Sequence, residues 1–228
     1  MIVAKFILII MLGYFLGSIP VGLLVSRFQA KKDVRQFGSG KTGATNVLRT
    51  AGAKAAAMVA IGDLLKGTVT VMLAGLIFGN DLLVLGSFGI GNLVAQVVAA
   101  LAAVAGHTWS LFLRFKGGRG VATFFGGLVA LCPPAALIGG EVLMVSVGIT
   151  RYASFGSILG VVAAYIILVP MTIIYRFPLE YLGYALVGSL VIIVMHRDNI
   201  NRLVSGTERK IGQKAENRDT PSTPGSGV

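Results

Sequence analysis

The sequence has few charged residues and very little acidic charge. Of its 228 residues 13% are charged, nine are Asp or Glu, and 55% are hydrophobic, which gives a mean hydropathy of +0.82. A soluble globule needs more polar surface than this to cover itself. Long stretches with almost no charge are typical of segments that cross a bilayer. The composition therefore excludes an ordinary soluble protein and predicts an all-α integral membrane protein.

Residues that build disulfides and metal sites are also scarce. Cys132 is the single cysteine, and the only histidines are His107 and His196. One thiol cannot form an internal disulfide, and the chain has no Cys/His spacing typical of a metal site. We therefore expect no metal and no cofactor.

Apolar runs divide the chain into candidate membrane spans. They cover residues 2–26, 55–79, 82–106, 120–132, 135–150, 155–175 and 181–196. A span needs ~20 residues, and two of the runs, 120–132 and 135–150, are short. These two form either short helices broken at Pro133-Pro134 or one re-entrant hairpin. The prediction is about seven transmembrane helices in a domain of residues 1–207, or five and a hairpin. The first run has no clear cleavage site, so we expect a retained helix rather than a signal peptide.

The positive charge lies between the apolar runs. Sixteen of the twenty Lys and Arg residues fall in segments 27–54, 106–119 and 196–228. Short basic loops of this kind face the cytoplasm and anionic lipid, which predicts an amino terminus outside and a carboxyl terminus in the cytoplasm. No basic face is interleaved with aromatic residues, so we expect no nucleic acid partner. Residues 208–228 are too polar to form a core and are predicted to be a disordered tail.

The stretch FGSGKTGATN at residues 37–46 resembles the end of a nucleotide-binding loop. The nucleotide motif G-x-x-x-x-G-K-[ST] needs a first glycine at position 35, where Arg35 stands, and it must follow a buried strand. This spacing and context exclude a nucleotide. The glycines still allow backbone N–H groups to converge on an anion, and Arg49 offers a bidentate donor for phosphate. The alternative is a flexible loop followed by an amphipathic helix on the membrane.

Two later segments repeat the combination of glycine, histidine and cations. One contains Gly106-His107 and the sequence FKGGRGVAT at residues 115–123. The other runs from His196 to Glu208, and its residues His196, Asn199 and Arg202 share one face if it is helical. A stop-transfer cluster would explain the arginines of this segment but not the histidine or the asparagine. Within an apolar run, Asp63 and Lys66 are expected to pair, and ionisable groups at such depth are functional candidates.

Together these segments resemble the bacterial acyl-phosphate:glycerol-3-phosphate acyltransferase family (PlsY). Gly38 to Arg49 match GSGN-x-GATN-x-x-R, Phe115 to Thr123 match FKGGKGVAT after GH, and His196 to Glu208 match HR-x-N-I-x-R-L-x-x-G-x-E. The D-x-x-KG and TRY-x-S-x-GS segments of the family are present too. Lys41, Ser110 and Arg119 depart from the pattern, replacing Asn, Pro and Lys. Arg119 keeps a cation for phosphate, whereas Lys41 either adds a phosphate contact or points to lipid headgroups.

The resemblance implies transfer of a fatty acyl group from acyl phosphate to the 1-hydroxyl of sn-glycerol 3-phosphate, giving lysophosphatidic acid and phosphate. It implies a multi-pass protein of the bacterial inner membrane, with the site in cytoplasmic loops 27–54, 106–123, 150–157 and 196–208. Its partners would be the two substrates and the lipid bilayer, with no nucleotide. The oligomeric state is not predicted. A small anion transporter and a lipid-binding scaffold are the alternative classes.

The resemblance also assigns roles to residues. The catalytic residues it implies are Ser39, His196 and Asn199. The substrate-binding residues it implies are Gly40, Gly43, Ala44, Thr45, Asn46, Arg49, His107, Lys116, Gly117, Gly118, Arg119, Ser154 and Arg202. The sequence shows no carboxylate near a histidine except Asp198. The proton acceptor is left open between His196 and an oxygen of the acyl phosphate.

Overall fold

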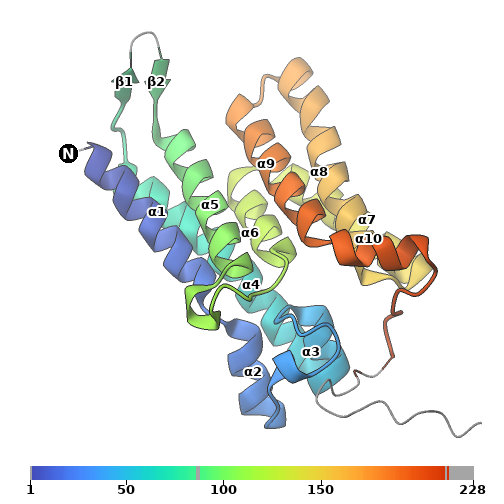
Figure 1. The fold of residues 1–228 in the computed structure, drawn as a ribbon. Coiled ribbons are helices and arrows are strands. Elements are labelled where there is room, and N and C mark those ends of the chain that lie inside the picture. The colour runs from blue at the N-terminus through green and yellow to red at the C-terminus, as the bar shows by residue number, and fades with distance from the viewer. Residues whose placement is uncertain (1, 86–87, 214, 216–228) are drawn as a thin grey trace, which may run out of the picture.

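The protein is a bundle of helices with one two-stranded hairpin (Figure 1). The computed structural model describes residues 2–85, 88–213 and 215. Its elements in chain order are α1 (Ile2–Ser18), α2 (Val21–Ala30), η1 (Val34–Gln36), α3 (Ala44–Ala51), α4 (Ala53–Phe78), β1 (Leu83–Leu85), β2 (Phe88–Ile90), α5 (Asn92–Thr108), η2 (Leu111–Leu113), α6 (Val121–Leu131), α7 (Pro133–Thr150), α8 (Ala153–Tyr175), α9 (Leu179–Met195) and α10 (Arg197–Val204).

Five segments of the described chain are long and apolar enough to cross a membrane, and α1 and α2 count as one of them. The pair α9 and α10, bent by 61°, would be a sixth. Helix α6 has 11 residues, which makes it about 16 Å long and too short for a hydrocarbon core of ~30 Å. The helical, multi-span architecture is confirmed, and the count of seven spans stays a prediction.

One apolar run is not a simple helix, and two others are separated by a break. The predicted run 82–106 begins as the hairpin, in which Leu83 pairs with Ile90 and Leu85 with Phe88, and its helix starts only at Asn92. Branched and aromatic side chains favour strand there, and the neighbouring glycines weaken a helix. The runs 120–132 and 135–150 are two helices separated at Cys132. The break follows from Pro133 and Pro134, because proline is accepted in the first turn of a helix but not in its interior.

Glycines bring several helices into backbone contact. A Cβ at Gly17 of α1 would overlap the backbone of Ala103 in α5. A Cβ at Gly67 of α4 would overlap the Thr123 carbonyl of α6, and one at Gly126 would overlap the Leu64 carbonyl. Small residues of this kind let helices approach closely where lipid supplies no hydrophobic drive for association. The α4–α6 contact sets the start of α6 beside the middle of α4.

Helix α6 lies inside the bundle. It contacts α4, α5, α7 and α9, and its Phe124 and Leu128 are buried in the largest core cluster. The ring of Tyr184 stacks on Phe124 with centroids 5.2 Å apart, and the Tyr184 hydroxyl donates to the Phe124 carbonyl at 2.9 Å. A short helix surrounded by protein does not have to span the bilayer, because its ends are not exposed to lipid.

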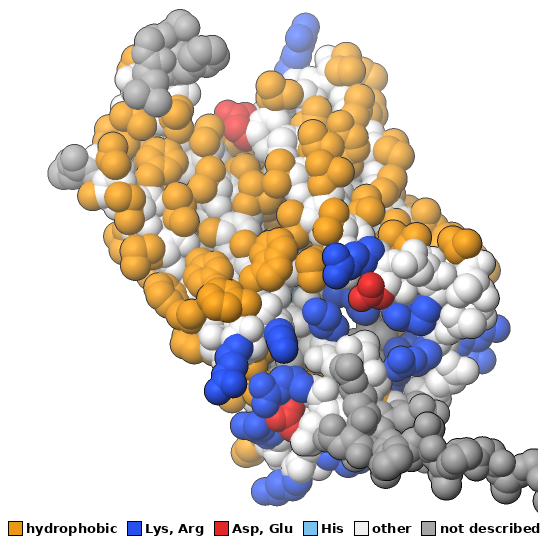
Figure 2. Space-filling model, viewed as in Figure 1, with side chains coloured by type: hydrophobic (Ala, Val, Ile, Leu, Met, Phe, Trp, Pro, Cys, Tyr) orange, Lys and Arg blue, Asp and Glu red, His pale blue; other side chains and the backbone are white. Residues whose placement is uncertain are grey.

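The basic loops lie at one end of the bundle. The end that carries α2, α3 and α10 is opposite the end that carries the amino terminus and the β-hairpin (Figure 1). Hydrophobic side chains cover most of the visible surface between the ends, and Lys and Arg gather over the α2–α3–α10 end (Figure 2). Segments far apart in the sequence therefore meet at one face.

Candidate functional site

A cavity of about 540 Å³ opens within the basic end of the molecule. It is lined by the first basic loop and α3, by the segment that leads into α6, by the starts of α8 and α10, and by one side of α7. One part of its wall is polar and cationic and the other is apolar. The cavity is therefore shaped for a molecule that is anionic at one end and apolar at the other.

Besides the start of α10, three helix N-termini face this cavity. Its lining includes the residues at which α3, α6 and α8 begin, namely Gly43 and Ala44, Gly120 and Val121, and Ala153 and Ser154. None of these three helices has a side-chain cap or an acidic residue in its first turn. Their first N–H groups and positive dipole ends are therefore free to face an anion.

The first loop is shaped by glycines and by Asn46. Gly38 and Gly40 have φ angles of 55° and 69°, in the region that glycine enters without steric cost. The Asn46 side-chain oxygen accepts from the Ser39 N–H at 3.3 Å. Its amide nitrogen donates at 2.9–3.1 Å to three loop carbonyls, those of Val34, Phe37 and Lys41. Asn46 therefore uses its amide N–H donors to hold the loop together, whereas the sequence analysis assigned this side chain to substrate binding.

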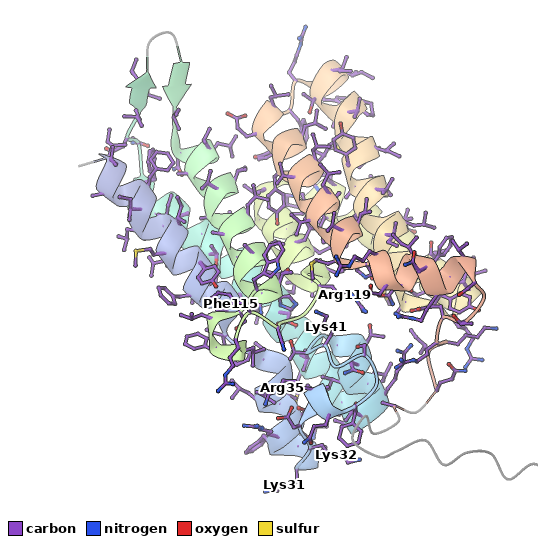
Figure 3. The ribbon with its side chains drawn as sticks, viewed as in Figure 1. Lys31, Lys32, Arg35, Lys41, Phe115 and Arg119 are labelled. Carbon is purple, nitrogen blue, oxygen red and sulfur yellow. The ribbon has the colours of Figure 1, made fainter. Side chains whose placement is uncertain are left out.

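The second loop carries Arg119 into the cavity. Gly117 and Gly118 donate their N–H groups to the carbonyls of Thr108 and His107, at 3.1 and 3.0 Å. Figure 3 shows Arg119 and Lys41 between the first loop and the start of α6. Burial lowers the pKa of Arg119 to about 10, and burial together with the charge of Arg119 lowers the pKa of Lys41. Arg119 therefore remains cationic near neutral pH.

The third segment places His196 and Asn199 on the same cavity. The His196 Nδ1–H donates to the Ile192 carbonyl at 2.8 Å, so Nε2 is the unprotonated nitrogen of the neutral ring. Burial, reinforced by the nearby Arg119 charge, lowers the pKa of His196 to about 4. The ring is therefore neutral at physiological pH and its Nε2 is able to accept a proton.

Glu208 joins the site, a role that the sequence did not assign. Its carboxylate accepts from Ser154 Oγ at 2.9 Å, Asn199 Nδ2 at 2.7 Å and Arg202 Nε at 2.8 Å. Burial opposes ionisation, but these hydrogen bonds outweigh it and lower the pKa of Glu208. The signal in the sequence was the acidic residue that closes the third motif.

The segment predicted as a tail begins with packed residues. Arg49 donates to the carbonyls of Arg209 and Lys210 at 2.9 and 3.4 Å. Arg151 donates to the Ile211 carbonyl at 2.9 Å, and its own carbonyl accepts from the Ile211 N–H at 2.7 Å. Residues 209–211 therefore pack against Arg49 and Arg151, and Glu208 and Ile211 line the cavity. Residues 214 and 216–228 of the predicted tail lie outside the described residues.

The expectation about carboxylates and histidines is wrong. Asp63 Oδ1 lies 3.4 Å from His107 Nδ1 and 2.8 Å from Lys66 Nζ. The predicted Asp63–Lys66 pair is confirmed, and His107 is brought to it because α4 packs against α5. The Asp198 side chain, the one noted in the sequence, is 72% exposed beside Arg197.

Most of the predicted site residues meet at the cavity. Those on its lining are Ser39, Gly43, Ala44, Thr45, Asn46, Arg49, His107, Arg119, Ser154, His196 and Asn199. Those that do not line it are Gly40, Lys116, Gly117, Gly118 and Arg202. Lys116 is exposed. Gly117 and Gly118 hold the loop against the end of α5 through their N–H groups.

Several polar atoms at the cavity have no partner. Among the described residues, Arg49 Nε, Arg119 Nε and Asn199 Oδ1 are buried without a hydrogen bond. Unsatisfied buried polar atoms are rare and costly in proteins. The two arginine donors therefore point to an anionic ligand.

The apolar wall continues from this polar end. Along α7, Val147, Leu143, Gly140 and Ala136 follow one another at intervals of three or four residues and face the cavity. Leu64, Phe125 and Val129 complete the wall from α4 and α6. Such a surface binds hydrocarbon, because transfer of apolar groups from water is favourable.

The fold and site thus define a multi-span membrane protein with a cavity for an amphiphilic anion. The model of the glycerol-3-phosphate acyltransferase family matches residues 7–206, and the chain belongs to that family. It is therefore a multi-pass membrane protein of the acyltransferase class.

Curated relatives agree with this assignment. The chain is 58% identical over 215 residues to glycerol-3-phosphate acyltransferase 3 of Dehalococcoides mccartyi (strain CBDB1), covering 94% of this chain and 100% of the relative. It is 44% identical over 202 residues to glycerol-3-phosphate acyltransferase of Synechococcus sp. (strain JA-3-3Ab), covering 89% and 91%.

Among solved structures, the chain is similar to PlsY (YgiH), an integral membrane glycerol 3-phosphate acyltransferase, in its glycerol 3-phosphate form. The TM-score is 0.78 at 33% identity, covering 91% of this chain and 96% of that chain.

The anion site predicts a measurable response to inorganic phosphate. At about ten times its Kd, phosphate should raise the Tm of the protein in detergent by about 3–6 °C, because it binds only the folded state. Arg119→Gln should remove most of this shift. Arg176→Gln changes an exposed cation after α8 and should keep it. An equal shift with chloride at matched ionic strength would contradict the assignment.

Proposed function

We propose that the protein transfers a fatty acyl group from acyl phosphate to the 1-hydroxyl of sn-glycerol 3-phosphate, with lysophosphatidic acid and phosphate as products. The observation that carries the proposal is one cavity in which three uncapped helix N-termini and half-buried cations meet an apolar wall. Both substrates are phosphorylated, and one also carries a hydrocarbon chain. The family assignment supplies the acyl acceptor named for the relatives.

The polar end would hold the two phosphates. Arg49, Lys41 and Arg119 supply the charge, and the N-termini of α3, α6 and α8 supply N–H donors. Ser39 and Thr45 on the cavity lining add neutral donors. Lys116, exposed at the base of the second loop, would attract anionic substrate at the entrance. Neutralising two adjacent dianions is the main electrostatic task of the site.

The reaction itself needs little covalent chemistry from the protein. The glycerol 3-phosphate hydroxyl oxygen attacks the acyl carbonyl carbon, the new ester C–O bond forms, and the bond from that carbon to the phosphate oxygen breaks. The hydroxyl proton passes either to His196 Nε2 or to an oxygen of the departing phosphate. Orientation of hydroxyl against carbonyl lowers the barrier, and N–H groups around the cavity stabilise the charge that develops on the carbonyl oxygen.

The apolar wall would hold the acyl chain. Gly140 lies ten residues before the end of α7 at Thr150, which places it about 15 Å along the helix from the polar end. The chain would therefore run beside α7 from Val147 towards Ala136, between α7 and α6.

The site would face the cytoplasm of a bacterial cell from its inner membrane. The basic segments at the cavity end favour that side, and the amino terminus and Arg176 would then lie outside. Helices α1, α4, α5, α7, α8 and α9 would cross the membrane, and the short α6, enclosed by its neighbours, would be the seventh predicted segment without reaching across the whole hydrocarbon core.

The donor is tested with purified protein, glycerol 3-phosphate and palmitoyl phosphate, following phosphate release. We expect turnover with palmitoyl phosphate and little or none with palmitoyl-CoA, because the anion end fits a phosphate leaving group. Equal turnover with palmitoyl-CoA, or none with palmitoyl phosphate, would contradict the proposed donor.

The turnover of His196→Ala in the same assay distinguishes between the two candidate proton acceptors, His196 Nε2 and an oxygen of the departing phosphate. A protein base at His196 predicts a loss of about 10²–10⁴ in kcat. Full turnover of this variant would assign the proton to the phosphate leaving group.

Gly140 should set how long a chain the apolar wall accepts. A Cβ at Gly140 meets no atom within 4 Å, so Gly140→Leu would occupy the cavity without disturbing the helices. We expect kcat/KM to fall about tenfold for palmitoyl phosphate and less than about twofold for octanoyl phosphate. Gly148→Leu is the matched control, since Gly148 lies on the same helix in equally open space but off the cavity. Equal losses with both chain lengths would show that the wall does not hold the chain.

The orientation is tested by single cysteines and an impermeant maleimide in intact cells. Arg176→Cys should react from outside, whereas Lys32→Cys should react only after permeabilisation. Both positions are exposed, and the native Cys132 is 1% exposed and should stay silent. The reverse labelling pattern would invert the topology.

A further inference from the structure

One buried charged cluster plays no part in the reaction described above. Asp63 and Lys66 of α4 and His107 of α5 have side chains that are 3%, 6% and 5% exposed. Ionisable groups at this depth are rare in membrane helices and usually serve a function. Asp63 and His107 also lie on the cavity lining.

His107 seats the loop that carries Arg119. Its carbonyl accepts from the Gly118 N–H at 3.0 Å. Its ring lies so close to Gly118 that a Cβ there would overlap Nε2. The loop backbone therefore rests directly on the imidazole, and the next residue along the chain is Arg119.

The orientation of that imidazole depends on Asp63. His107 Nδ1 lies 3.4 Å from Asp63 Oδ1, an ion contact, and makes no hydrogen bond to any of the described residues. The Nε2 edge of the imidazole lies against Gly118. If the ring turned, it would consequently lose its contact with Asp63 and displace the loop.

Asp63 is itself held in place. Lys66 Nζ pairs with it at 2.8 Å and also donates to the Ile19 carbonyl at 3.3 Å. Nearby, Gly67 and Gly126 bring α4 and α6 into backbone contact. The carboxylate is thus held in a fixed position. It can therefore set the position of the ring and, through the ring, the position of the loop.

We propose that Asp63 is a positioning residue that holds the His107 ring against Gly118 and thereby sets Arg119 in the phosphate end of the cavity. Lys66 neutralises and anchors the carboxylate. The kinetic consequences rest on the proposed function, because they assume that Arg119 binds a phosphate of the substrates.

A double-mutant cycle between Asp63 and Arg119 tests this. Asp63→Asn should lower kcat/KM about tenfold in the native chain, mainly through KM, and less than about twofold in the Arg119→Gln background. A merely structural role predicts the same fold loss in both backgrounds, and that outcome would overturn the proposal. Asp81→Asn removes an ion pair with Lys5 of 2.8 Å at the other end of the bundle and should leave kcat/KM unchanged in both backgrounds.

Hydrogen–deuterium exchange gives a readout that does not need turnover. Peptides covering residues 109–120 should exchange faster in Asp63→Asn than in the native protein or in Asp81→Asn. If the native protein shows no turnover, the proposed function fails, and this comparison alone decides the positioning role. Unchanged exchange would overturn it. Should Asp63→Asn not fold, Gly118→Ala disturbs the same contact from the loop side and should give the same dependence on Arg119 and the same faster exchange.

Discussion

Backbone contact between α4 and α6 is the constraint on which the site depends. Gly67 faces the Thr123 carbonyl and Gly126 faces the Leu64 carbonyl, so any side chain at either glycine would separate the helices. The contact places the first turn of α6 beside Asp63 and lets a short helix end inside the protein. The N-terminus of α6 can then face the cavity together with those of α3 and α8.

The described lining of the cavity carries an excess of positive charge. Cations and uncapped N–H groups lie together in a poorly solvated space, where a polar group without a hydrogen bond raises the free energy of the folded state. Glu208 offsets part of this by binding Ser154, Asn199 and Arg202. The Nε donors of Arg49 and Arg119 remain without partners among the described residues. A phosphorylated substrate would complete the set, so substrate binding and the stability of this end are linked.

Much of this arrangement was predictable from local patterns. Runs with almost no charge predicted the helical membrane architecture, and the three motif segments contained about half of the residues that line the cavity. Contacts between distant segments were not predictable. Asp63 lies beside His107 only because α4 packs on α5. Asn46 donates its side-chain N–H groups to carbonyls of its own loop. The paired strands Leu83–Leu85 and Phe88–Ile90 were missed because an apolar run of that length does not distinguish strand from helix.

The sequence by itself determined the class of protein and the chemistry of its loops. Hydropathy and charge act residue by residue, so they can be read without a structure. Tertiary structure decided which donors are free for a ligand and which are used internally, because that depends on packing between helices far apart in the chain. Arg49 illustrates both contributions. Its sequence motif predicted a phosphate ligand, and in the folded protein one nitrogen of its guanidinium donates to the carbonyls of Arg209 and Lys210.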